Sequence, residues 1–171
     1  GLAPLAVAVL DAGGHLVALM GTLPLPEEES TSSRVQAVCD WYGPTDLLTM
    51  PPNVMSATRS REQVEKSNGA QLLGAPVMDV PALARQCSAF YQASAGDAPF
   101  LIMHGSEDPG VPLEQSRNLH QALRHAGVES TLEIVEGAGH GGPGFQTDAV
   151  KAVVKAFFDK HLKPVTARSA P

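Results

Sequence analysis

The chain has 171 residues, 43% of them hydrophobic and 18% charged, and its formal net charge is −6. This composition is typical of one soluble globular domain, is too apolar for a disordered chain, and allows a core without metals or disulfides. The acidic balance argues against a nucleic acid or an anionic membrane as the main partner. No apolar run approaches the ~18 residues of a membrane span, and no secretion leader is visible, which leaves the localisation unknown.

The reactive side chains do not form a pattern that holds a metal or a cofactor. Cys39 and Cys87 are too few for a disulfide framework and are interpreted as buried thiols. The histidines lack the i, i+3 or i, i+4 spacing that places two ligands on one helix face; His120 and His125 are five apart. The sequence therefore predicts neither a metal site nor an organic cofactor.

The first third of the chain predicts a strand, a helix and a second strand. Residues Leu5–Leu10 form an apolar run typical of a buried strand, and a helix is expected over Gly13–Met20. A second strand is expected over Val35–Trp41. The intervening stretch 23–33, with two prolines and three consecutive glutamates, is interpreted as a surface loop, as is the stretch 51–59.

The rest of the chain repeats this alternation. Ser60 with Gln63 indicates a capping box at the start of a helix. A third strand over Phe100–His104 is followed by a helix over Leu113–Ala126 that ends at Gly127. The last two elements are a half-buried strand over Thr131–Val135 and an amphipathic helix that carries Val150, Val153, Val154, Phe157 and Phe158 on one stripe.

Strands that alternate with helices predict an α/β fold, a three-layer α/β/α domain with a mostly parallel sheet of about four strands. Residues 1–163 are expected to form this single domain, and residues 164–171 a disordered tail. Ligand sites in such a sheet lie beyond the carboxyl ends of the strands. Three loops that leave those ends carry reactive residues: 10–15, 104–109 and 137–144.

Two of these loops contain the elements of a general acid–base pair. His140 lies in a glycine-rich loop after the last strand, where an exposed imidazole can accept a proton at neutral pH. Asp108 follows the neighbouring strand, and a carboxylate there can hold the imidazole tautomer. The alternative is an ordinary loop histidine and an Asp-Pro turn, and the spacing alone does not decide between the two.

Four segments resemble the esterase and lipase group of the α/β-hydrolases, which includes feruloyl- and acetyl-ester hydrolases. They correspond to the end of the nucleophile elbow, the segment after the sixth strand, the acid loop and the histidine loop: residues 12–16, 42–46, 99–108 and 137–141. Their order is the order that this fold uses. The chain thus resembles the C-terminal part of an α/β-hydrolase. The resemblance implies that Asp108 is the triad acid, that His140 is the triad base and that the Ala12 N–H is an oxyanion donor.

The elbow departs from the family pattern G-x-S-x-G because it contains no serine. In one alignment Asp11 stands at the nucleophile position and Val9 replaces the first glycine. In the other alignment the serine is deleted and Asp11 is the residue that precedes it. Ser106, in the acid loop, and Ser116, on a helix, are not interpreted as substitutes.

The second departure is that no strands and no HGG-type oxyanion motif precede Leu5. The Leu5–Leu10 strand is then an apolar sheet edge, which favours pairing with another chain or segment. We expect this edge to be covered, either by a second copy of the chain in a dimer or larger homo-oligomer, or by a missing N-terminal part of the protein.

Three functions stay open on the sequence. The resemblance implies a carboxylic-ester hydrolase acting on a small ester, although loss of the serine is expected to lower activity by several orders of magnitude. The second hypothesis is a hydrolase in which Asp11 is the nucleophile, as in haloalkane dehalogenases and epoxide hydrolases. The third is a non-catalytic relative that acts as a binding or oligomeric module.

Overall fold

A four-stranded parallel sheet forms the centre of the molecule. The computed structural model describes residues 6–23 and 34–163. Its strands are β1 (Ala6–Leu10), β2 (Ala37–Trp41), β3 (Phe100–Gly105) and β4 (Ser130–Val135). They lie side by side in the order of the sequence, and every neighbouring pair is parallel. The predicted α/β fold with about four parallel strands is therefore confirmed.

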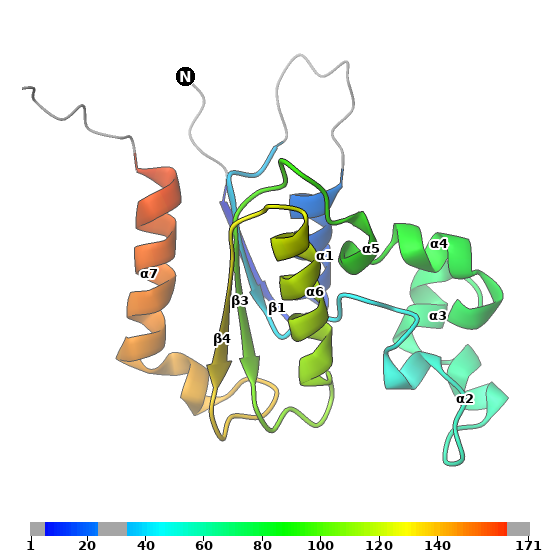
Figure 1. The fold of residues 1–171 in the computed structure, drawn as a ribbon. Coiled ribbons are helices and arrows are strands. Elements are labelled where there is room, and N and C mark those ends of the chain that lie inside the picture. The colour runs from blue at the N-terminus through cyan, green and yellow to red at the C-terminus, as the bar shows by residue number, and fades with distance from the viewer. Residues whose placement is uncertain (1–5, 24–33, 164–171) are drawn as a thin grey trace, which may run out of the picture.

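Helices cover both faces of the sheet (Figure 1). Helices α1 (Ala12–Thr22) and α6 (Leu113–His125) lie on one face, and α7 (Asp148–Leu162) lies on the other. Helix α6 ends one residue earlier than predicted, and Gly127 has the positive φ of 79° that favours glycine after a helix end.

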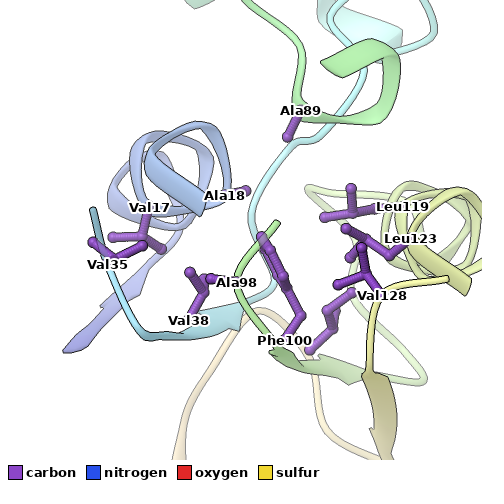
Figure 2. Packing of buried hydrophobic residues seen from close by; sticks show 11 residues of the cluster. Val17, Ala18, Val35, Val38, Ala89, Ala98, Phe100, Leu119, Leu123 and Val128 are labelled. Atoms are coloured by element: carbon purple, nitrogen blue, oxygen red, sulfur yellow. The ribbon is translucent and has the colours of Figure 1, made fainter. Parts of the chain in front are cut away.

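Two apolar clusters hold these layers together. On the α1 and α6 side, Phe100 and Val38 of the sheet belong to one buried cluster with Val17 and Ala18 of α1 and Leu119 and Leu123 of α6 (Figure 2). On the opposite face, Leu101 and Met103 belong to a second buried cluster with Phe157 of α7. Phe100 and Leu101 are consecutive in β3 and therefore point to opposite faces, which is why the strand reads as a continuous apolar run.

The long connection between β2 and β3 forms a lobe of short helices beside the sheet (Figure 1). They are α2 (Arg61–Glu65), α3 (Asn68–Leu73), α4 (Pro81–Gln86) and α5 (Ala89–Gln92), with 3₁₀ turns at Pro51–Asn53 and Val77–Asp79. The Ser60–Gln63 capping box is present at the start of α2, as predicted. The predicted surface loop over 51–59 begins with a 3₁₀ turn that buries Asn53.

Two earlier expectations concern segments outside the described residues. They are the loop at 24–33 and the disordered tail at 164–171. Strand β1 pairs with β2 on one side, and no other described strand pairs with it. The covering of this edge stays a prediction. Within the described ranges, no helix combines the length and the apolar character needed to cross a bilayer.

Candidate active site

Three strands deliver the candidate residues to one edge of the sheet. Asp11 follows β1, Asp108 lies in the loop after β3, and His140 lies in the loop after β4. Because the strands are parallel, these loops all leave the same edge, and the structure brings the three side chains together. Residues that are far apart in the sequence thus form one cluster.

His140 lies between two carboxylates. Its Nδ1 is 2.7 Å from Asp108 Oδ2, and its Nε2 is 3.3 Å from Asp11 Oδ1. The ring of Tyr42 packs against the imidazole, with 4.5 Å between the ring centroids. Burial, followed by the nearby charges of Asp11 and Asp108, raises the pKa of Tyr42. The phenol therefore stays neutral beside the imidazole.

Asp108 is held as a buried carboxylate. Its side chain is 0% exposed, and its Oδ1 accepts hydrogen bonds from the backbone N–H groups of Gly110 at 2.8 Å and Val111 at 2.9 Å. Burial acts to raise the pKa of this group, but the hydrogen bonds from Val111, His140 and Gly110 outweigh it and place the pKa below its usual value. Asp108 is thus ionised at neutral pH and can orient His140.

Asp11 occupies a strained turn between β1 and α1. Its φ of 54° and ψ of −119° lie where residues other than glycine are rare, and such a conformation costs on the order of 1–3 kcal/mol. The turn is fixed by two backbone hydrogen bonds, from Asp11 N–H to the Trp41 carbonyl and from His15 N–H to the Asp11 carbonyl, both 3.1 Å long. Ala12 then begins α1, so its N–H is one of the first-turn donors without an intrahelical partner.

A second carboxyl group, Asp40, lies underneath this turn. It is fully buried on β2, and its Oδ1 accepts the Gly43 N–H at 3.1 Å, whereas its Oδ2 has no partner among the described residues. A Cβ at Gly14 would lie 2.5 Å from Asp40 Oδ1, so only glycine fits there without a shift. Burial raises the pKa of Asp40 to about 7. In the sequence, the feature that could have indicated a role for Asp40 is its place as the one charged residue of an otherwise apolar strand.

His104 is a further residue whose role the sequence analysis missed. It is buried at the end of β3, and its Nε2 lies 3.4 Å from Asp108 Oδ2. The same Nε2 is 2.9 Å from the Val111 carbonyl, which can only accept, so this nitrogen carries the proton. Nδ1 then accepts the hydroxyl of Ser116 at 2.6 Å, and burial lowers the pKa of His104, which keeps it neutral.

The other candidates serve the local structure. His15 is buried behind the turn at Asp11, with its Nδ1 2.9 Å from the Pro44 carbonyl. Asp46 closes a turn, since its carboxylate accepts the Leu48 N–H at 3.0 Å and the Thr49 hydroxyl at 2.9 Å. The Ser106 hydroxyl accepts a hydrogen bond from the N–H of Gly137 at 2.8 Å.

A pocket of ≈ 470 Å³ opens beside Asp11 and His140 and extends to the lobe between β2 and β3. Besides Asp11 and His140, it is lined by Ala12, His15, Leu16, Pro44, Leu47, Met50, Pro52, Asn53, Asn68, Gly69, Leu72, Gly110 and Val111. Across residues 6–23 and 34–163, no three His, Cys, Asp or Glu side chains are grouped so as to hold a metal ion.

The parallel sheet, its helical layers and the three loops at its carboxyl edge define a partial α/β-hydrolase fold. The chain belongs to the BD-FAE family of this esterase group, whose family profile matches residues 4–123. A second α/β-hydrolase profile, described as TAP-like protein, matches residues 79–169.

Several proteins similar to this chain are esterases. Esterase LipC of Mycobacterium tuberculosis is 33% identical over 152 residues, which are 80% of this chain and 34% of LipC. A solved truncated carbohydrate esterase from gut microbiota is 27% identical, with a TM-score of 0.72 over 94% of this chain and 60% of that one. The butyrate-bound esterase Est2 of Thermogutta terrifontis is 25% identical, with a TM-score of 0.66 over 93% of this chain and 58% of that one. The chain thus spans about a third of LipC and less than two thirds of these solved esterases.

Proposed function

We propose that this chain carries a carboxylic-ester hydrolase site in which Asp11 occupies the nucleophile position and Asp108 with His140 forms the acid–base pair. One observation carries the proposal: His140 Nε2 lies 3.3 Å from the carboxylate of a residue held at φ 54° in the strand-to-helix turn. In a serine hydrolase, this ring nitrogen accepts the proton of the attacking hydroxyl. Here a carboxylate stands where that hydroxyl is required.

The site supports direct attack by water on the ester. His140 Nε2 takes a proton from a water molecule as its oxygen adds to the carbonyl carbon, while Asp108 stabilises the imidazolium. The Ala12 N–H is proposed to stabilise the resulting oxyanion. Collapse of the tetrahedral intermediate breaks the C–O bond to the alcohol, which leaves with the proton from His140. Asp11 competes with water for Nε2, so we expect slow turnover.

The test is to restore the hydroxyl. Asp11→Ser is expected to raise kcat/KM for p-nitrophenyl butyrate by at least about 100-fold, because a hydroxyl held beside His140 Nε2 replaces attack by a free water molecule, and such positioning of a nucleophile contributes at least a factor of this size. The butyrate bound in the related Est2 supports a short acyl chain as the first substrate. Asp11→Asn is the matched control, since it removes the charge without supplying a hydroxyl.

The gain must depend on the proposed base. Adding His140→Ala to Asp11→Ser should return the rate to the background level. Equal activity of the Asp11→Ser variant and the wild-type chain would contradict the proposal, and so would a gain that survives the loss of His140.

The same contact favours a second candidate function, in which Asp11 is itself the nucleophile. One carboxylate oxygen of Asp11 would attack a saturated carbon, expel halide or open an epoxide, and leave an ester between Asp11 and the alkyl group. Water deprotonated by His140 would then attack the Asp11 carbonyl carbon and release the alcohol. This route predicts halide or diol formation that Asp11→Asn abolishes. Absence of both activities would favour the binding or oligomeric module.

A further inference from the structure

We infer that the pocket beside Asp11 selects uncharged esters and holds their apolar chain between Leu16 and Leu72. The inference rests on the proposed function, because it assumes that the pocket receives the ester. It goes further in naming the substrate class and two specificity-determining side chains on different helices, Leu16 on α1 and Leu72 on α3.

These two leucines are unusual for their exposure. Leu16 is 57% exposed and Leu72 is 55% exposed, yet both line the pocket. Below them, Leu47 and Met50 are buried and line the same pocket. An apolar chain between the two leucines would remove their side chains from water, which is the favourable term in binding of apolar ligands.

Two polar side chains of the pocket lining, Asn53 and His15, are bound to carbonyl groups of the protein itself. The Asn53 side-chain N–H donates to the Leu47 carbonyl at 2.8 Å, which fixes the lobe wall. The His15 ring nitrogen Nδ1 lies 2.9 Å from the Pro44 carbonyl. Recognition along this part of the pocket is therefore expected to depend on apolar contact, and polar recognition on the end near Asp11 and His140.

The charges near the pocket disfavour an anionic substrate. Among the described residues, the pocket lining contains the carboxylate of Asp11 and no lysine or arginine, and the Asp108 carboxylate lies next to His140. An anionic substrate would bring a second negative charge close to the Asp11 carboxylate in this partly desolvated space. No cation of the described lining would pair with it. The volume of ≈ 470 Å³ lies in the lower half of the range for small-molecule sites, which suits a small monoester.

The experiment measures binding directly, because the wild-type chain is expected to turn over too slowly to consume the ligand. The ¹⁵N-labelled chain is titrated, with NMR detection, with ethyl hexanoate and with the monoethyl adipate anion, which has the same chain length but ends in a carboxylate. We expect ethyl hexanoate to bind at least tenfold more tightly and to shift amide signals around the pocket. Leu16→Ser and Leu72→Ser should each weaken its binding at least threefold.

Leu83→Ser is the matched control, because Leu83 is an exposed leucine outside the pocket lining. Its Kd should equal that of the wild-type chain. Equal affinities for the two esters, or no effect of Leu16→Ser and Leu72→Ser, would overturn the inference even if Asp11→Ser hydrolyses esters. Conversely, selective binding of ethyl hexanoate combined with an inactive Asp11→Ser variant would overturn the proposed hydrolysis and leave the pocket assignment standing.

Discussion

The buried imidazole of His104 lies 3.4 Å from Asp108 Oδ2, the same oxygen that His140 Nδ1 approaches to 2.7 Å. One histidine thus contacts the acid from inside the fold and the other from the pocket. Through Val111 and Ser116, His104 also links the acid turn to α6. We propose that His104 is a positioning residue, which holds the Asp108 carboxylate in the orientation that contacts His140 Nδ1.

The first prediction concerns this link. In His104→Leu, the Ser116 hydroxyl and the Val111 carbonyl lose their partner, which should lower the free energy of unfolding by about 1–3 kcal/mol. In the Asp11→Ser background, kcat for ester hydrolysis should fall together with the stability. His104→Gln keeps a donor near the position of Nε2, so it should restore part of the stability, measured by urea unfolding, and part of kcat.

The exposed His125 provides the control for His104. His125→Gln should leave stability and kcat unchanged. A His104→Leu variant that unfolds more easily but keeps its kcat and the NMR signals of the His140 ring would show a purely structural role.

The second prediction is a pH dependence that originates at Asp40. Its folded-state pKa of about 7, raised by burial, lies above the 3.8 that is usual for an aspartate. Between these two values the unfolded chain releases the proton and the folded chain keeps it, so stability falls as the pH rises. The favourable contribution is complete below about pH 4 and lost above about pH 7, at roughly 1.4 kcal/mol per unit of pKa difference.

Asp40→Asn tests this assignment, because its amide oxygen can still accept the Gly43 N–H. The free energy of unfolding of the variant minus that of the wild-type chain should increase by a few kcal/mol as the pH rises from 4 to 8. Glu107→Gln, at an exposed position, should show no such change in urea unfolding. A constant difference between Asp40→Asn and the wild-type chain across this range would rule out titration of Asp40.

The third prediction concerns the close packing of α1 on Asp40. In Gly14→Ala the new methyl group would lie 2.5 Å from Asp40 Oδ1 and 2.9 Å from Gly43 Cα, so the start of α1 must move. Overpacking of this kind costs about 1–3 kcal/mol, measurable by thermal or urea unfolding. Gly139→Ala is the control, since its nearest contact would be an ordinary 3.8 Å. Equal stabilities of the two variants would mean that the turn accommodates the methyl group.

The sequence was sufficient to predict the sheet and the site loops. Apolar runs located all four strands, and the rule that parallel strands end at one edge placed Asp11, Asp108 and His140 in neighbouring loops. It did not predict helices α3 to α5, because helices of four to six residues are too short to show an amphipathic stripe. Of these helices, α3 contributes Asn68, Gly69 and Leu72 to the pocket lining.

Two buried relationships were also beyond the sequence. His104 and Asp108 belong to a strand end and to the loop after it, and their contact depends on how that loop folds back over the strand. Asp40 meets Gly14 only because α1 packs its first turn against the end of β2. Both contacts are fixed by tertiary packing, and no local pattern of residue types indicates them.

The last prediction concerns Tyr42, whose φ of 44° is unusual for a large side chain. Its ring packs against His140, at 4.5 Å, and against Phe145, at 4.9 Å between centroids. Tyr42→Phe keeps both contacts and should preserve stability and the orientation of His140. Tyr42→Ala removes the wall behind the imidazole and should cost about 3–5 kcal/mol, in the range for loss of a buried aromatic ring.

The measurement combines urea unfolding with kcat in the Asp11→Ser background. In Tyr42→Ala, kcat should fall by a larger factor than the factor by which KM changes. Without the packing of Tyr42, the His140 imidazole is aligned with the attacking hydroxyl for less of the time. Tyr42→Phe separates this packing effect from any role of the hydroxyl group. If Tyr42→Phe loses as much activity as Tyr42→Ala, the phenol oxygen contributes directly and the ring is more than a support for His140.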